Sequence, residues 1–370
     1  MAPAVAAADT DTLQEPVLDR FLFFTRRDNT MKERDEALIV WFGALSFFLS
    51  TIEYLIPKPL PFLRLGLANL PLLLAASFFP MKHYLLLVFI KILGQGLTGG
   101  TLFSYIFFFS AAGTISSALI MKTVFSLFPH QVSHAGVSAL GAFISNVVQL
   151  ILARFYIFGI SAWYIAPPFM AVGLVSGFVL GAFANAYYHN SRWFAELREG
   201  KISIPSIPEV SPKKNKHRRN SKLLRLIVGG SMIGLLLTAS DVKIMAAICT
   251  LAITFLLLEG STIHVFPVII MSASIIFFNL LVPSGKILWE PFYLQITEGA
   301  LFSGIKKALL LEGMIFLSRW MLKPGIELPG ITGKRISRMF TVLALLLSSR
   351  KKISPRNIVA SIDDIMYGLG

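Results

Sequence analysis

Long apolar stretches, separated by short loops and by one strongly basic segment, dominate this chain of 370 residues. A helix needs about 20 residues to cross the ~30 Å hydrocarbon core of a bilayer, and the longest stretches match that length. Only 15% of the residues are charged and 55% are hydrophobic, whereas a soluble domain carries about 25% charged residues. The sequence therefore predicts an all-α, polytopic integral membrane protein.

About ten of these stretches qualify as transmembrane helices. Those before the basic segment are expected at about 37–55, 65–79, 84 to a break within 94–100, 101–121, 135–158 and 165–187. Those after it are expected at about 223–239, 242–258, 263–282 and 300–321. We therefore expect a six-helix bundle followed by a four-helix membrane half.

The composition divides the chain into five parts. They are a polar amino-terminal tail at 1–36, a six-helix membrane domain at 37–187, a basic linker at 188–222, a second membrane domain at 223–322 and a basic tail at 323–370. The first tail lacks the apolar core of a signal peptide, and residues 17–27 in it are predicted to form a surface helix. In the last part, residues 339–347 are predicted to form an amphipathic helix lying on the membrane.

The distribution of charge predicts the orientation of the chain. Most of the excess Lys and Arg lies in the two tails and the linker, while the opposite loops carry few basic residues. Since cytoplasmic loops are enriched in Lys and Arg, we expect a multi-pass protein of the cytoplasmic (inner) membrane with both termini inside. The basic cluster at 213–219 could bind nucleic acid, but its position between two spans favours a cytoplasmic loop with weak attraction to anionic membrane lipid.

Polar residues in or near the spans are the candidates for a substrate site, because such residues are costly in a membrane and often functional. Glu53, Arg64 and Asn69 are expected close together near the outer face. An ion pair between Glu53 and Arg64 would fix the hairpin between the first two spans. The same group could instead face a ligand, and the two roles are compatible.

Four further polar residues are expected at membrane depth. Gln95, Asn146 and Gln149 are uncharged, and they could form interhelical hydrogen bonds or line a binding site. Asn146 and Gln149 are three residues apart and share a helical face. Lys91 could snorkel to an interface, pair with a carboxylate or bind an anionic group, and the sequence favours snorkelling.

Glycines in the sixth span predict close helix packing. Gly173, Gly177 and Gly181 recur every four residues, which places small side chains along one face of the helix. The glycine-rich stretch at 94–100 could break the third span beside a cavity, as discontinuous helices do in transporters.

Several chemistries are not supported by the sequence. Residues 330–335 (GITGKR) do not form a P-loop, because Arg335 stands where the magnesium-binding Ser or Thr is needed. Asp363 and Asp364 are followed by Tyr367 at the position where an aspartate would complete a DDxxD motif. No Cys/His cluster has metal-ligand spacing. We therefore expect no metal, no cofactor and no enzymatic activity of the chain by itself.

The first membrane domain resembles the Gx transporter family, which is also labelled heptaprenyl diphosphate synthase component I. The resemblance covers about 37–187 and rests on EYLIP at 53–57, RLGLAN at 64–69, GGTL at 99–102, SSALIM at 116–121, GVSALGA at 136–142, and Asn146 with Gln149. Ser145 departs from the family pattern, in which a histidine is expected.

This resemblance implies the substrate-binding S component of an energy-coupling-factor (ECF) importer of a small nutrient, powered by ATPases on separate chains. The substrate would enter beside residues 56–64, and the residues expected to hold it are Glu53, Arg64, Asn69, Gln95, Asn146 and Gln149. The second half has a weaker likeness to a T component, at ITEGAL (296–301). Two other roles stay open: an accessory membrane subunit in polyprenyl (heptaprenyl) diphosphate synthesis, and a scaffold without a substrate.

Overall fold

The computed structural model describes most of the two predicted membrane halves. The described residues are 34–51, 53, 66–128, 131–199, 201, 217–290, 295–322, 330–349, 360, 362–364 and 367. The predicted surface helix at 17–27, the loop at 56–64 and residues 213–216 of the basic cluster lie outside this set. The described chain is all-α apart from one short hairpin.

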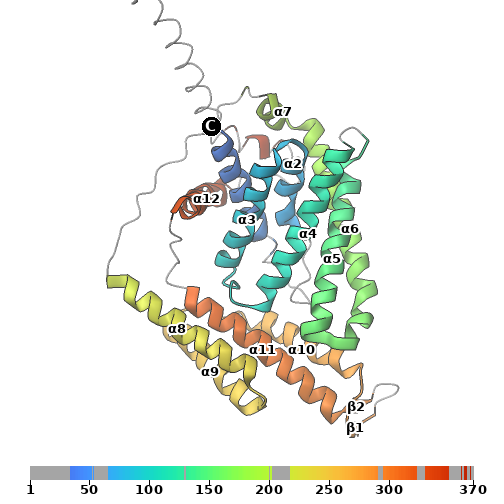
Figure 1. Cartoon of the computed structure of the whole chain (residues 1–370), viewed down its shortest axis with the longest axis vertical. Coiled ribbons are helices and arrows are strands. Elements are labelled where there is room, and N and C mark those ends of the chain that lie inside the picture. The colour runs from blue at the N-terminus through green and yellow to red at the C-terminus, as the bar shows by residue number, and fades with distance from the viewer. Residues whose placement is uncertain are drawn as a thin grey trace, which may run out of the picture.

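The first half is a bundle of helices that run along the long axis of the molecule (Figure 1). Its helices are residues 34–51, α2 (Leu70–Phe78) preceded by the 3₁₀ turn η1 (Leu67–Asn69), α3 (Met81–Thr98), α4 (Tyr105–Leu127), α5 (His134–Ala153) and α6 (Ala162–Asn190). They follow the six predicted apolar stretches in order. The glycine-rich stretch ends α3 rather than interrupting it, because the helix continues through Gly94 and Gly96 to Thr98.

Local sequence signals determine where α5 and α6 meet. Ser133 caps α5, and its hydroxyl accepts a hydrogen bond from the backbone N–H of Gly136 at 3.2 Å. The chain then passes through a π-helical segment, η2 (Arg154–Phe158), and a 3₁₀ turn, η3 (Gly159–Ser161), into α6. Gly159 has φ of +56°, a conformation that glycine adopts without steric penalty. The chain therefore reverses direction between α5 and α6, and the two helices pack side by side.

The second half lies across one end of this bundle. It contains α8 (His217–Thr238), α9 (Val242–Leu258), α10 (Val265–Leu280) and α11 (Glu298–Leu322), with a hairpin of β1 (Ile287–Trp289) and β2 (Ile296–Thr297) before α11. Figure 1 shows that α8, α9 and α11 run obliquely to the first bundle. At 17 and 16 residues, α9 and α10 are about 25 Å long, so the count of about ten transmembrane helices stays a prediction.

The two halves meet at the turn between α3 and α4. The backbone N–H of Phe103 donates to Ser318 Oγ on α11 at 3.1 Å. Gly100, at φ of +63°, packs against Arg319, and a β-carbon built there would lie 2.6 Å from Arg319 Cγ. Next to this contact, apolar side chains of α4 and α11 share one buried cluster that includes Phe109 and Leu311.

Two further helices pack on the bundle: α7 (Arg192–Glu199) lies at its opposite end, and α12 (Gly330–Ser349) lies against its side, next to the first helix and α3. The linker predicted at 188–222 therefore contains α7 and the start of α8. The helix predicted at 339–347 belongs to α12, whose apolar face packs on the bundle. Met339 is fully buried against Gly43 of the first helix, and the rings of Phe340 and Phe47 lie 5.8 Å apart.

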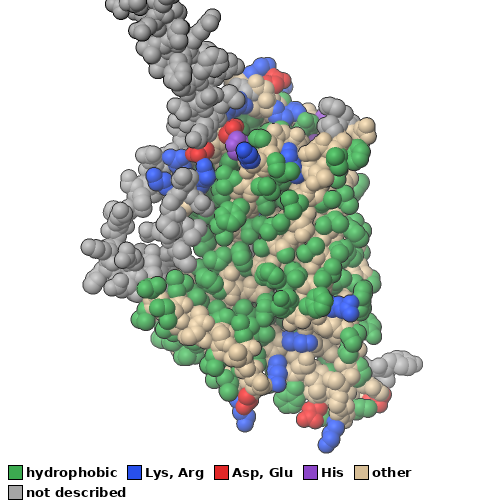
Figure 2. Space-filling model, in the orientation of Figure 1, with side chains coloured by type: hydrophobic (Ala, Val, Ile, Leu, Met, Phe, Trp, Pro, Cys, Tyr) green, Lys and Arg blue, Asp and Glu red, His purple; other side chains and the backbone are tan. Residues whose placement is uncertain are grey.

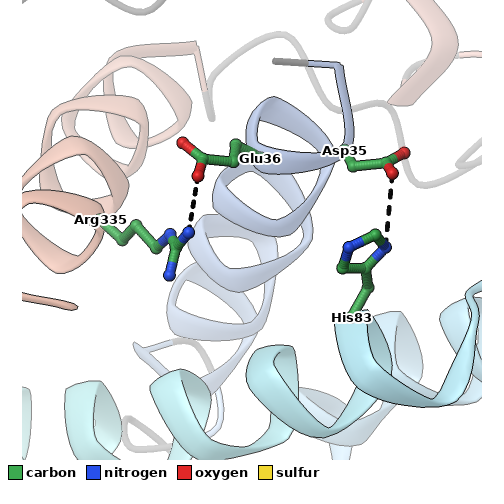
Figure 3. A network of polar contacts seen from close by, with 4 residues as sticks. All are labelled: Asp35, Glu36, His83 and Arg335. Atoms are coloured by element: carbon green, nitrogen blue, oxygen red, sulfur yellow. Dashed lines mark hydrogen bonds and ion pairs between the residues drawn. The ribbon is translucent and has the colours of Figure 1, made fainter. Parts of the chain in front are cut away.

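Two polar contacts hold the start of the first helix between α12 and α3 (Figure 3). Arg335 Nη2 lies 2.6 Å from Glu36 Oε1, and His83 Nδ1 lies 3.4 Å from Asp35 Oδ2. The two adjacent carboxylates point to opposite sides of their helix (Figure 3). Each therefore contacts a different neighbour, which fixes the rotation of the first helix at this end.

The outer surface of both halves is strongly apolar. On the face shown in Figure 2, hydrophobic side chains cover most of the middle, and most charged side chains lie toward the upper and lower ends. Large hydrophobic residues such as Val175, Val179 and Leu258 are 65%, 61% and 79% exposed. Among the described residues, α4 and the continuous segment His134–Asn190 are long and apolar enough to cross a bilayer, and several shorter apolar helices accompany them. This surface gives the chain the character of a membrane protein.

Candidate functional site

A buried lysine lies at the centre of the first bundle. Lys91, in the middle of α3, is 2% exposed. Its Nζ donates to Asn69 Oδ1 at 2.9 Å and lies 3.5 Å from Thr114 Oγ1 on α4. The favoured expectation that Lys91 snorkels to an interface is wrong, because its amine is directed into the bundle and hydrogen-bonded there.

Asn69 is positioned by a tight turn at the start of α2. Gly66, at φ of +85°, accepts a hydrogen bond from the Asn69 backbone N–H at 2.8 Å. The Gly66 N–H in turn donates to Glu53 Oε1 at 3.3 Å. Glu53 is 3% exposed, so this carboxylate is held near the turn that carries Asn69. Arg64, the partner expected for Glu53, lies outside the described residues.

Gln95 is one turn beyond Lys91 on α3 and joins that helix to the first one. Its Nε2 donates to Ser50 Oγ at 2.9 Å. Close by, Gly94 faces the ring of Phe47, and any side chain at position 94 would overlap that ring. The glycine therefore permits the close helix contact in which Gln95 and Ser50 meet.

Asn146 and Gln149 are both buried on α5, but they contact different neighbours. Asn146 Nδ2 donates to the carbonyl of Phe169 on α6 at 2.9 Å. Gln149 Nε2 donates to Ser145 Oγ at 2.9 Å, and both side chains lie against Gly113 of α4. Asn146 therefore makes an interhelical hydrogen bond, as the sequence allowed. Gln149 faces α4, the helix that also carries Thr114.

The three glycines of α6 all lie against α5. A β-carbon on Gly173 would overlap the Asn146 amide. One on Gly177 would lie 2.6 Å from Ala142 Cβ, and one on Gly181 would lie 2.6 Å from the carbonyl oxygen of His134. The small residues thus allow α5 and α6 to approach along most of their length.

The buried polar residues consequently form two groups, each in contact with α4. Asn146 belongs to neither group, because its amide faces α6. One contains Glu53, Asn69, Lys91 and Gln95, around α3 and the start of α2. The other contains Gln149 and Ser145 on α5, next to Gly113. Because residues 113 and 114 are adjacent on α4, the two groups are neighbours. Together they provide amide, hydroxyl, carboxylate and ammonium groups inside an apolar bundle, which suits a small polar or anionic ligand.

Three buried residues among the Lys, Arg, Asp and Glu of the described chain were not among the predicted site residues: Lys91, Glu312 and Asp363. The sequence favoured snorkelling for Lys91 and did not place it in the site. Its position deep within the third span was the feature that could have indicated a buried role. Glu312 on α11 is 5% exposed, and its signal was an acidic residue inside the apolar stretch 300–321. No group of three or more His, Cys, Asp or Glu residues that could hold a metal is found in the described part of the chain.

Comparison with known families separates the same two halves. Residues 42–187 match the family model described as heptaprenyl diphosphate synthase component I, which confirms the likeness to that label. Residues 221–324 match a model described as a domain of unknown function (DUF8519). No curated protein and no solved structure matches the chain.

Proposed function

We propose that this chain is a membrane transport protein whose first half binds a small nutrient, as the S component of an ECF-type importer does. ATPases on separate chains would supply the energy. The second half would serve as a T-like membrane partner in the same polypeptide. The observation that carries the proposal is the hydrogen-bonded Lys91 with Asn69 and Thr114, buried in a bundle whose outer surface is apolar.

The energetics favour a functional role for this lysine. A charged side chain at the centre of a bilayer is destabilising by about 2.5–3.5 kcal/mol on insertion scales, so such residues usually mark a substrate or ion pathway. Lys91 presents an ammonium group, which pairs with carboxylates and phosphates. Residues 53 and 69 flank the loop at 56–64, through which we expect the substrate to enter from outside.

The orientation is part of this proposal. We expect residue 34, α7 and α12 to face the cytoplasm, with the amino terminus, the linker and the carboxyl terminus on that side. The start of the first helix and α7 lie together at one end of the bundle (Figure 1), and Lys and Arg gather there (Figure 2), which supports this arrangement. The start of α8, at the far end of the linker, lies with the second half. Single-cysteine labelling in intact cells tests it, because residue 82 should be protected from a membrane-impermeant reagent.

Ligand binding can be tested without knowing the substrate. Native mass spectrometry of the chain extracted in lipid nanodiscs should show a bound small molecule. Lys91→Met should lose this adduct, because it removes the ammonium group while preserving the length of the side chain. Lys82→Met is the matched control, since Lys82 is exposed on the same helix and should retain the adduct. Equal adducts in both variants would exclude Lys91 from the site.

Energy coupling needs a separate test. The purified chain in proteoliposomes should bind the ligand but should not accumulate it when ATP is added. Uptake should appear only when partner ATPases are present. ATP-driven uptake by this polypeptide alone would overturn the proposed division of labour.

The description of the matched family favours a second candidate, an accessory membrane subunit in heptaprenyl diphosphate synthesis. Prenyl transfer requires carboxylates that hold magnesium against a diphosphate. Asp363, one of the adjacent aspartates in the tail, instead accepts hydrogen bonds from Ser191 Oγ at 2.6 Å and from the Arg192 N–H at 2.9 Å. Prenyl-transfer assays on the partner synthase, with and without this chain, distinguish the two functions.

A further inference from the structure

A second buried charged group lies outside the first bundle, in the interior of the second half. Glu312 is on α11 and is 5% exposed. Within the described part of the chain, its Oε1 atom has no hydrogen-bond partner. The hydroxyl of Ser272 on α10 is in hydrogen-bonding position to the same carboxyl group. One oxygen of a buried carboxyl is thus left without a donor.

Few charges surround this carboxyl. The helix α10 contains no charged residue and no histidine. On α9, the titratable group that interacts with Glu312 is Cys249, whose thiol donates to the carbonyl of Leu309 at 3.2 Å. The cation that acts on Glu312 is Arg319, two turns further along α11.

Three other charged groups of this half have partners elsewhere: Arg225, Glu259 and Lys307. Arg225 on α8 and Glu259 after α9 form an ion pair at 2.6 Å, and Glu259 also accepts a hydrogen bond from Trp320 Nε1 at 3.0 Å. Lys307 Nζ donates to Asn279 Oδ1 at 2.7 Å. The side chains around Glu312 therefore provide one hydroxyl donor and one more distant cation.

An ionised carboxylate in such surroundings is costly, because removing an ion from water has a penalty of several kcal/mol that only close partners offset. A bound proton removes the charge and converts one oxygen into a donor. We propose that Glu312 is a proton-binding site of the second half, neutral at rest. When the proton is released it passes to water, and the carboxylate that remains is stabilised by Arg319.

The location of Arg319 connects this site to the first half. Arg319 packs against Gly100 in the turn between α3 and α4, beside the hydrogen bond from Phe103 to Ser318. A change in the charge of Glu312 therefore acts on the residue that contacts the first bundle. This inference does not rest on the proposed substrate site, since it concerns a different helix and a different ligand, the proton.

Infrared spectroscopy of the full chain in lipid nanodiscs tests the inference directly. A protonated carboxyl has a carbonyl stretch that is distinct from that of a carboxylate and shifts in D₂O. At neutral pH the wild-type spectrum should contain such a band, and Glu312→Gln should lose it. Glu298→Gln is the matched control, because Glu298 is exposed at the start of the same helix and the band should persist.

Two results would overturn the inference. One is a wild-type spectrum at neutral pH without a protonated carboxyl, which is decisive whatever the variants do. The other is a band that persists unchanged in Glu312→Gln, which would assign it to another carboxyl. If the Gln variant fails to fold, Glu312→Asp replaces it. A shorter carboxyl in the same site should shift the band, and an unshifted band would exclude position 312.

Discussion

Replacing Gly173 with alanine should separate α5 from α6 at the point where Asn146 bridges them. The three atoms nearest to a β-carbon at position 173 all belong to Asn146; the amide nitrogen would overlap it and Cγ would lie at 2.8 Å. The amide must therefore rotate away from the Phe169 carbonyl, 2.9 Å from its nitrogen. Overpacking destabilises a protein by about 1–3 kcal/mol, and the interhelical hydrogen bond contributes roughly 0.6–1.7 kcal/mol. The expected loss for Gly173→Ala is about 2–4 kcal/mol.

A double-mutant cycle isolates this cause. Asn146→Ala alone should lower the free energy of unfolding by about 1 kcal/mol, through the lost hydrogen bond. In that background, Gly173→Ala should be nearly neutral, because the colliding atoms are gone and alanine favours a helix over glycine by up to about 1 kcal/mol. Gly234→Ala on α8 is the control, because no atom lies within 4 Å of its β-carbon position.

The measurement is equilibrium unfolding in mixed micelles, followed by tryptophan fluorescence. Coupling between positions 146 and 173 should be about 2–4 kcal/mol, which is the difference between the Gly173→Ala losses with and without Asn146. The control should be neutral or slightly stabilising. If Gly173→Ala is equally destabilising with and without Asn146, the steric explanation is refuted, and the glycine must matter for another reason.

Two predictions concern α7 and α12, which pack on the bundle. Asp363→Ala should remove the hydrogen bonds that cap α7, at a local loss of stability of about 0.5–2 kcal/mol. Amide hydrogen exchange at 192–199 should therefore become faster. Asp364 is the exposed neighbour, and Asp364→Ala should leave exchange there unchanged. Arg335→Gln should break the partly exposed pair with Glu36 and lower the protection of α12 by only about 0.2–1 kcal/mol. Glu36→Gln should give the same loss and the double variant no more, and additive losses would show that the two residues act independently.

The helices themselves could be predicted closely from the sequence. The α9 helix was expected at 242–258 and occupies Val242–Leu258. Its start is determined locally, because Asp241 Oδ1 accepts a hydrogen bond from the Lys243 N–H at 2.9 Å. Its end is followed by Gly260 at φ of +69°. Apolar length and terminal signals were sufficient here, since neither depends on distant parts of the chain.

The direction of a buried side chain was harder to predict. Lys91 lies ten residues into α3, about 15 Å along the helix from Met81. The other end of α3, at Thr98, is about 10 Å away. Both distances are greater than a lysine side chain can span, so the two helix ends together would have argued against snorkelling. Asn146 and Gln149 illustrate a related limit. At a spacing of three they share one broad face, but that face meets both α6 and α4, and each residue contacts a different helix.

How the two halves pack could not be predicted, because a side chain that faces lipid and one that faces another helix are equally apolar. Leu311 is 1% exposed in the contact with the first half, whereas Leu257 is 56% exposed, and the sequence does not distinguish them. The resulting contact has a mechanical consequence. It lies at the turn after α3 and before α4, and these two helices carry Lys91 and Thr114. A displacement of α11 that preserves the contact must therefore move α3 and α4 at that end. The buried polar residues around Lys91 and next to Gly113 would move with these two helices.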